Sequence, residues 1–191
     1  MNFQRLLRAD TVAMVAALVL LLVLAMDWYS TGVGDRAREI EKLSQPGGQG
    51  AQGDEAAREN AEAARFEAQS QEKNAWQVTG AVDRLILILL LGTIILAVAA
   101  AWLRAAGRRF EPPATPSTAV AILVTLSGLL VAYRILQEPG FDSSTTVKAG
   151  APVALVVLGV IALAARAAMR AEADGSAWPD PEPEGDAGTP A

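Results

Sequence analysis

The sequence contains no cysteine and no histidine among its 191 residues. Without cysteine there are no disulfide bonds, thiol nucleophiles or thiolate metal sites. Without histidine there are no imidazole metal ligands, no bis-imidazole haem and no histidine general base. Any catalysis would have to use carboxylates, arginine, lysine, tyrosine, serine or threonine. We therefore expect no metal and no cofactor, and no residue stands out as catalytic.

Concentrated positive charge is also lacking. The chain carries 16 basic and 21 acidic residues, for a formal net charge of −5, and no cluster of five or more lysines and arginines occurs. This distribution argues against a nucleic-acid-binding surface. The Gly-rich stretch QPGGQGAQG has neither a following Lys-Ser/Thr nor a preceding apolar strand, so it is not a phosphate-binding loop.

Apolar residues make up 52% of the chain and are gathered in four blocks rather than spread in short periodic stripes. Each block, with its flanks, reaches the roughly 17–25 residues that a helix needs to cross about 30 Å of hydrocarbon. A helix also satisfies its own backbone polar groups in lipid. The pattern predicts an all-α membrane protein with four transmembrane helices, at 11–30, 81–103, 117–136 and 149–169.

The basic residues predict the orientation of these helices. Seven arginines flank three of the connecting or terminal segments: Arg5, Arg8, Arg104, Arg108, Arg109, Arg166 and Arg170. By the positive-inside rule, we expect residues 1–10, 104–116 and 170–191 in the cytoplasm of a multi-pass plasma-membrane protein. Residues 31–80 and 137–148 are then extracytoplasmic. The alternative for the first block is a signal peptide that is cleaved after Ala25.

The long loop 31–80 is expected to be partly helical. A short helix is predicted over 34–44, a flexible linker over 45–53, and a second helix within 54–76, which is rich in strong helix formers. Four alanines of this second helix follow a 4-3-4 spacing: Ala57, Ala61, Ala64 and Ala68. They could pack weakly on another helix, but a solvated single helix is the favoured interpretation, because alanine buries little area.

The C-terminal tail 170–191 is expected to be disordered. It has six acids after Arg170, no bases and four prolines, so it cannot bury a core. Trp178 within it is either a short docking element or part of an unstructured chain.

Three charged residues fall at the predicted extracytoplasmic boundary of the membrane. Asp27 and Asp83 are two candidate partners for Arg134, because an ion at this depth calls for a counter-charge. The pair would be a polar site, a structural clasp, or no pair at all if Arg134 extends to water. Aromatic side chains at the ends of the spans are expected to lie at the lipid headgroups as interfacial anchors: Trp28, Tyr29, Trp76, Trp102 and Tyr133.

Small residues suggest how the helices pack. The third span carries Ala121, Thr125, Gly128 and Ala132 at a 4-3-4 spacing, and the second span carries Thr93, Ala97 and Ala101. Such stripes let helix backbones approach closely. We predict that they form packing faces within the molecule, with oligomerisation as the alternative.

Short motifs at the span ends resemble those of a group of uncharacterised four-helix integral membrane proteins from actinobacteria and related high-GC bacteria. They are DWYS after the first span, NAWQVTGAVDRLILIL entering the second, YRILQEPG closing the third, and VKAGAPVALVVLGVIALAARAAMR over the fourth. The resemblance covers most of the chain outside the long loop and the tail. It implies the four-helix topology and no particular activity.

These observations favour a non-catalytic membrane protein that acts as an interaction or accessory component of a larger membrane assembly. Its partners would be the lipid bilayer and other membrane proteins. A small-molecule transporter or channel subunit is the first alternative. A lipid-headgroup-modifying enzyme is the second, and it would need Asp27 and Asp83 to converge on a substrate.

Overall fold

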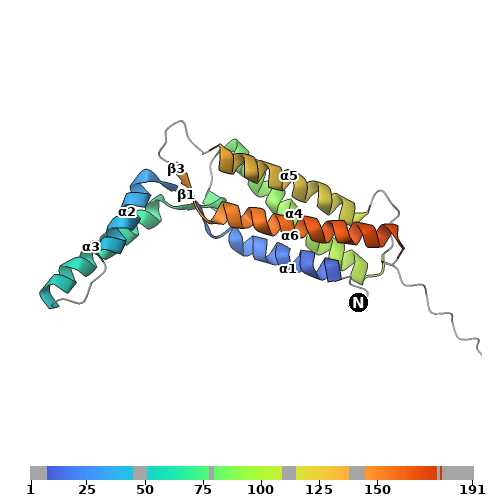
Figure 1. Ribbon diagram of the computed structural model, residues 1–191, viewed down its shortest axis with the longest axis horizontal. Helices are drawn as coiled ribbons and strands as arrows, with labels where there is room; N and C mark the ends of the chain where they lie inside the picture. Colours follow the sequence, from blue (N-terminus) through green and yellow to red (C-terminus); the bar gives the residue numbers. More distant parts are fainter. Residues whose placement is uncertain are drawn as a thin grey trace, which may run out of the picture.

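The chain folds into a helical bundle with a helical hairpin that projects from one end of it (Figure 1). The computed structural model describes residues 8–44, 51–77, 80–108, 115–137, 145–175 and residue 177. The chain is mostly helical, as the apolar blocks predicted. Residues 45–50, which connect the two hairpin helices, and most of the C-terminal tail, including Trp178, lie outside the described residues.

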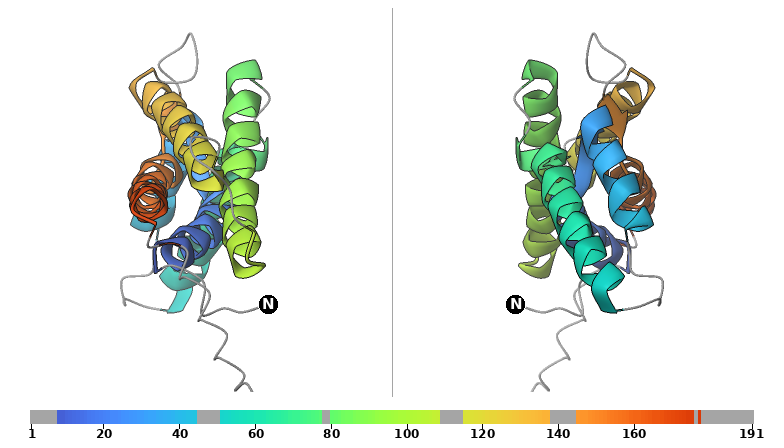
Figure 2. Two further views of the ribbon diagram at one scale, coloured as in Figure 1. Left: turned by 90° about the vertical axis from the view of Figure 1, so that its right-hand side faces the viewer. Right: turned by 90° about the vertical axis from the view of Figure 1, so that its left-hand side faces the viewer.

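Four helices form the bundle: α1 (Arg8–Val23), α4 (Ala81–Ala105), α5 (Pro116–Leu136) and α6 (Gly150–Ala173). Helix α1 packs against α4 and α6, and α5 packs against the same two helices, so the four enclose one core (Figure 2). The start of α5 shows how the sequence sets a helix end. Thr115 caps it by accepting a hydrogen bond from the Thr118 amide at 3.3 Å, and Pro116 occupies the first helical position, where no amide hydrogen is needed.

Three of the described helices, α4, α5 and α6, are long and apolar enough to cross a membrane. Their bounds lie within a few residues of the predicted spans, although α6 continues to Ala173, so that residues 170–173 are helical rather than part of the tail. Helix α1 has 16 residues and ends at Val23, so the expected helix over 11–30 is too long. The chain turns at 24–26 and continues as a strand, because residues 27–31 pair with two later segments.

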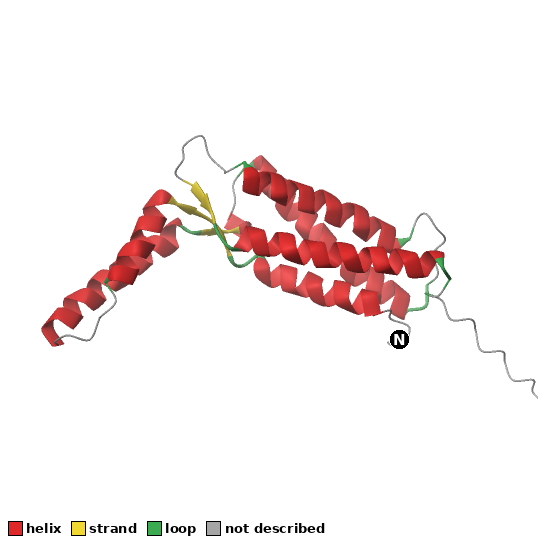
Figure 3. Cartoon of the chain, viewed as in Figure 1, coloured by secondary structure: helices red, strands yellow, loops and turns green. Residues whose placement is uncertain are grey.

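A three-stranded antiparallel sheet lies between the bundle and the hairpin (Figure 3). Its central strand is β1 (Asp27–Thr31), flanked by β2 (Lys73–Asn74) and β3 (Thr145–Val147). Tyr29 is opposite Lys73 on one side and Val147 on the other. The all-α expectation is therefore wrong in this region. Strands of two to five residues are too short for an alternating pattern to reveal them, and they pair over long sequence separations.

The hairpin consists of α2 (Gly32–Leu43) and α3 (Ala51–Gln71), which pack against each other. Thr31 caps α2 by accepting a hydrogen bond from the Gly34 amide. Ala64 and Ala68 on α3 are buried, and so is Ala37 on α2. The alanine stripe therefore packs on a helix, and the favoured interpretation of α3 as a solvated single helix is wrong. Helix α3 also begins inside the predicted linker, at Ala51.

The predicted packing stripe on α5 faces the wrong way. Thr125 is exposed, and a Cβ added at Gly128 would meet nothing within 4 Å. Ala121 and Ala132, the other two members, are only partly buried. The interior is instead lined by the neighbouring stripe of α5: Ser117, Val120, Val124, Ser127 and Val131.

A polar contact lies on this inward face of α5. The Ser127 and Thr93 hydroxyls lie 3.1 Å apart in the buried interface between α4 and α5. Each hydroxyl also contacts a carbonyl of its own helix, Thr93 at Leu89 (2.8 Å) and Ser127 at Leu123 (2.9 Å), so both buried groups have partners. On α4 the structure places all three predicted packing residues, Thr93, Ala97 and Ala101, in the interior.

Candidate functional site

Arg134 and Asp83 form a bidentate ion pair at the end of the bundle next to the hairpin. Arg134 donates from Nε to Oδ1 and from Nη2 to Oδ2 of Asp83, at 2.6 Å each. Of the two candidate partners for Arg134, the structure therefore selects Asp83. Asp83 is buried in the first turn of α4, and Arg134 lies in the last turn of α5. Both positions suit the helix dipoles, since acids are stabilised at N-termini and bases at C-termini.

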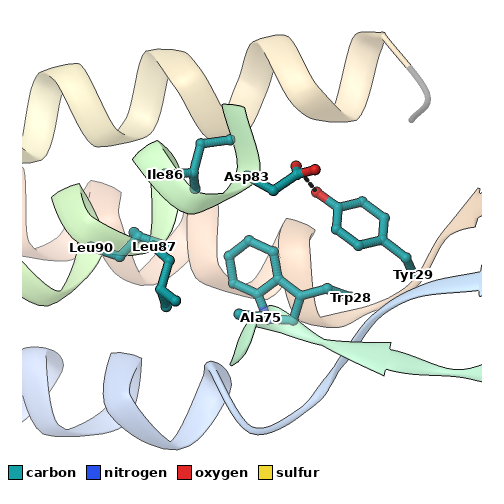
Figure 4. Close-up of a pocket in the computed structure, with 7 residues that line it drawn as sticks. All are labelled: Trp28, Tyr29, Ala75, Asp83, Ile86, Leu87 and Leu90. Carbon is teal, nitrogen blue, oxygen red and sulfur yellow. Dashed lines mark hydrogen bonds between the residues drawn. The ribbon is translucent and has the colours of Figure 1, made fainter. Parts of the chain in front are cut away.

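Tyr29 completes this group, which we call the hairpin-side cluster (Tyr29, Asp83 and Arg134). The Tyr29 hydroxyl donates a long hydrogen bond of 3.5 Å to Asp83 Oδ1 (Figure 4). The Arg134 guanidinium lies 5.9 Å from the centre of the tyrosine ring. Burial, together with the negative charge of Asp83, raises the pKa of Tyr29 to about 12. The tyrosine is thus a neutral donor at physiological pH, and it joins strand β1 to both helices.

Trp28 packs beside this cluster and closes a small pocket (Figure 4). The pocket measures about 10 Å³ and is lined by Trp28, Tyr29, Ala75, Asp83, Ile86, Leu87 and Leu90. That volume holds about one water molecule. The Trp28 indole donates to the Val23 carbonyl at 3.0 Å and so caps the end of α1.

The structure divides the predicted interfacial anchors into two groups. Trp28 and Tyr29 are buried, so the prediction that they lie among lipid headgroups is wrong for both. Strand β1 carries them into the protein, where each has a hydrogen-bond partner. Trp76, Trp102 and Tyr133 are about half exposed, and for them the prediction stands untested.

Asp27 has different surroundings from Asp83. It lies exposed on β1 opposite Asn74 of β2. Partial burial and the nearby charge of Glu72 raise the pKa of Asp27, while Arg38 and Lys148 act in the opposite direction. Asp83 is engaged by Arg134 and Tyr29. The two aspartates therefore have separate sets of partners, and the convergence that the enzyme alternative requires is not seen among the described contacts.

A second buried cluster lies at the other end of the bundle, and the sequence analysis missed it. We call it the distal cluster (Asp10, Arg104, Ser117 and Glu172). Arg104 Nε lies 2.7 Å from Asp10 Oδ2, and Arg104 Nη2 contacts both Glu172 and the Ser117 hydroxyl. Ser117 donates to Glu172 at 2.7 Å. Each of the four helices supplies one member, and all four side chains are at least nine-tenths buried.

The sequence did contain a signal for this cluster. Asp10 and Arg104 directly border uncharged runs, and Glu172 is the first acid after the last run. The positive-inside rule uses Arg104 only to predict topology, and it predicts no partner for the two acids. Charges that border apolar runs on different helices are candidates for pairing with one another.

Polar contacts also hold the hairpin at its base. Arg38 on α2 donates to both carboxylate oxygens of Glu72, at 2.8 and 2.6 Å. Asp35 on α2 accepts hydrogen bonds from Thr146 in β3 and from Lys148, the residue that follows β3. Arg38 lowers the pKa of Glu72, and Lys148 lowers the pKa of Asp35. These contacts join α2 to the end of α3 and also join α2 to strand β3 of the sheet.

In the described ranges, no three acidic residues lie close enough together to hold a metal ion. The charged side chains of both bundle clusters bind one another. No protein family, curated protein or solved structure matches this chain. The resemblance to four-helix proteins of actinobacteria therefore stays a prediction.

Proposed function

We propose that this protein is a multi-pass integral membrane protein that acts without catalysis, as an interaction component of a larger membrane assembly. Its contact element would be the hairpin α2–α3, held outside the membrane. Support comes from two observations: the clustered charges of the bundle pair with one another, and the larger apolar side chains of α2 are exposed.

The spacing of the two clusters supports insertion of the whole bundle. Asp83 and Arg104 lie 21 residues apart on α4, which is about 31 Å at about 1.5 Å per residue. This matches the roughly 30 Å of a hydrocarbon core. The clusters would then mark the two membrane boundaries, with α1 as a fourth spanning element. Exposed arginines gather at the distal end, at Arg8, Arg108, Arg166 and Arg170, which favours a cytoplasmic distal end and an extracytoplasmic hairpin.

One face of α2 carries the proposal. Val33, Ile40 and Leu43 are 50%, 52% and 80% exposed. With Arg36, which is also exposed, they follow a 3-4-3 spacing that places them on one stripe of the helix. This is the a/d pattern of a helix that packs against a second helix, with a positive charge at one position. Helix α3 packs on a different face of α2, through Gly34 and Ala37.

The side chains of this stripe indicate the chemistry of the surface that would bind it. The partner would be a helix of another membrane protein that presents apolar side chains to Ile40 and Leu43. An acidic side chain would face Arg36, because an unpaired arginine in an apolar seam is unfavourable. Transport gains no such support: the pockets beside the two bundle clusters measure about 10 Å³ each, too small for a substrate larger than water.

A photo-crosslinking amino acid placed at Ile40 or at Leu43 tests the proposal in native membranes. We expect one discrete adduct with another membrane protein from both positions, and its loss on Arg36→Glu. The matched control is the same probe at Gln69, an exposed position of α3. A charge swap supplies the decisive evidence: a basic residue at the partner's acidic position should restore crosslinking to Arg36→Glu. Equal adducts from Gln69, or an adduct with the mass of two copies of this chain, would contradict the accessory role.

A further inference from the structure

An apolar groove runs between α1 and α6 on the outside of the bundle, where the two helices lie side by side (Figure 1). Its volume is about 380 Å³, far larger than the two pockets of about 10 Å³ beside the bundle clusters. The lining is almost wholly apolar, with Val12, Val15 and Val19 from α1 and Val157 and Val160 from α6. Thr11 lies at one end. In a membrane, such a groove is filled by a lipid chain or by another helix.

The length of the groove distinguishes these occupants. Along α1 it extends from Thr11 to Val19, eight residues or about 12 Å at about 1.5 Å per residue. One leaflet of the hydrocarbon core is about 15 Å deep, whereas a transmembrane helix would need contact along about 30 Å. The groove begins next to Asp10 of the distal cluster, so it opens to the leaflet at that end. Its dimensions suit one acyl chain from that leaflet.

A positive charge lies at the entrance of the groove. Arg8 is exposed and precedes Thr11 by three residues and Val12 by four, which places it on the same face of α1, one turn nearer the membrane surface. Within the described ranges Arg8 has no ion-pair partner, because Asp10 is buried against Arg104. A guanidinium at headgroup depth binds a phosphate through paired hydrogen bonds.

We propose that this groove binds an anionic phospholipid, with one acyl chain between α1 and α6 and the phosphate at Arg8. The inference depends on the proposed membrane insertion but not on the proposed role of the hairpin. The leaflet is the one at the distal end. A lipid held there would fill the outer seam of α1, the shortest of the four bundle helices.

The full chain in nanodiscs of phosphatidylcholine and phosphatidylglycerol provides the test, with retained lipid identified by native mass spectrometry. We expect one phosphatidylglycerol to stay bound to the wild type in preference to phosphatidylcholine. Arg8→Gln should reduce this preference about fivefold, the effect of one basic side chain near a membrane surface. Val15→Trp should abolish retention of either lipid, because the indole fills the groove.

Matched controls separate the groove from general membrane effects. Arg170→Gln removes an exposed arginine from α6 at the same end, and Leu129→Trp adds an indole to an exposed position of α5. Both should retain lipid as the wild type does. Thermal unfolding confirms that each variant is folded, and Ile40→Glu on the hairpin should leave lipid binding unchanged. The proposal is overturned if no lipid is retained, if Arg8→Gln and Arg170→Gln act equally, or if Val15→Trp instead abolishes a protein–protein complex.

Discussion

Arg134 holds Asp83 through two parallel hydrogen bonds of 2.6 Å, so that the last turn of α5 is joined to the first turn of α4. Asp83 is buried and Arg134 is mostly buried, with 18% of its side chain exposed. Loss of one partner leaves the other charge poorly solvated. A double-mutant cycle on Asp83 and Arg134 can therefore measure how much their pairing contributes to the free energy of unfolding.

Asp83→Asn and Arg134→Gln should each lower the free energy of unfolding by about 2–3 kcal/mol, between the values for exposed and fully buried pairs. The double variant should lose clearly less than the sum, since neither charge is then stranded. Thermal or denaturant unfolding in detergent measures all three. Asp27→Asn is the control, and it should add to Arg134→Gln without coupling. Coupling of Arg134 to Asp27 rather than to Asp83 would contradict the observed geometry.

The distal cluster should be the more sensitive of the two. Arg104→Gln leaves Asp10 and Glu172 buried without their guanidinium and should cost about 3–5 kcal/mol. Adding Asp10→Asn and Glu172→Gln to that variant should recover part of the loss, because the stranded negative charges are removed. Arg108→Gln, an exposed arginine nearby in sequence, should change the unfolding free energy by less than about 0.5 kcal/mol. If Arg108→Gln and Arg104→Gln proved equally mild, the cluster would not be a structural element.

Two glycine-to-alanine substitutions probe the packing of the bundle directly. At Gly150 a Cβ would lie 2.6 Å from Trp28 Cδ1 and 2.7 Å from the Asp27 carbonyl oxygen. Gly150→Ala should therefore cost about 1–3 kcal/mol by overpacking. Gly128→Ala, where a Cβ meets nothing within 4 Å, should be neutral or stabilise by up to about 1 kcal/mol through helix propensity. Melting temperatures in one detergent compare the two, and the reverse order would refute the orientation of α5.

Acid should loosen the hairpin before it unfolds the bundle. The pKa values of Asp35 and Glu72 are lowered from their ordinary 3.8 and 4.5 by Lys148 and Arg38. A depressed carboxyl pKa stabilises the fold above the unfolded value and loses that effect as the pH falls through the folded value. Hydrogen exchange in α2 and α3 should therefore accelerate as the pH is lowered below about 4, after correction for the intrinsic rate.

The control for this acid effect removes the cations. Arg38→Gln together with Lys148→Gln should already show fast exchange at neutral pH and little further change in acid. Asp27, whose pKa is raised, contributes with the opposite sign, so Asp27→Asn should relieve a small destabilisation at neutral pH. A hairpin whose protection is unchanged by acid would show that these ion pairs do not hold it.

The long apolar runs made the bundle predictable. Helices α4, α5 and α6 begin and end within a few residues of the predicted bounds, because a continuous apolar block is a strong signal. Strand β1 was hidden within the first block, since the partners of Tyr29 in β2 and β3 lie 44 and 118 residues further along the chain. Because strand β1 was not predicted, the buried positions of Trp28 and Tyr29 could not be predicted either. An aromatic pair after an apolar run is typical of a membrane interface, and only the three-stranded sheet shows that this pair is buried in the protein.

The packing face of α5 and the distal cluster could not be predicted from the sequence for another reason. Small residues occur throughout this alanine-rich chain, so a 4-3-4 stripe at Ala121–Ala132 has little specificity. The inward face is decided by partners on another helix, such as Thr93 against Ser127. Likewise, Arg104 is recognisable as a charge at the end of an apolar run, but its acids come from α1 and α6, far away in sequence. Sequence periodicity carries no information about such pairings.

The position of β3 has a consequence for biogenesis. Lys148 contacts Asp35 across 113 residues of chain, and β3 pairs with β1 over a similar separation. During synthesis the hairpin is made long before α5 and β3, so for that interval one edge of β1 has no partner strand and Tyr29 has no guanidinium beside it. We therefore expect the hairpin to dock on the bundle only after α5 and β3 have been made. Docking of the hairpin would then depend on a late step in the assembly of the bundle.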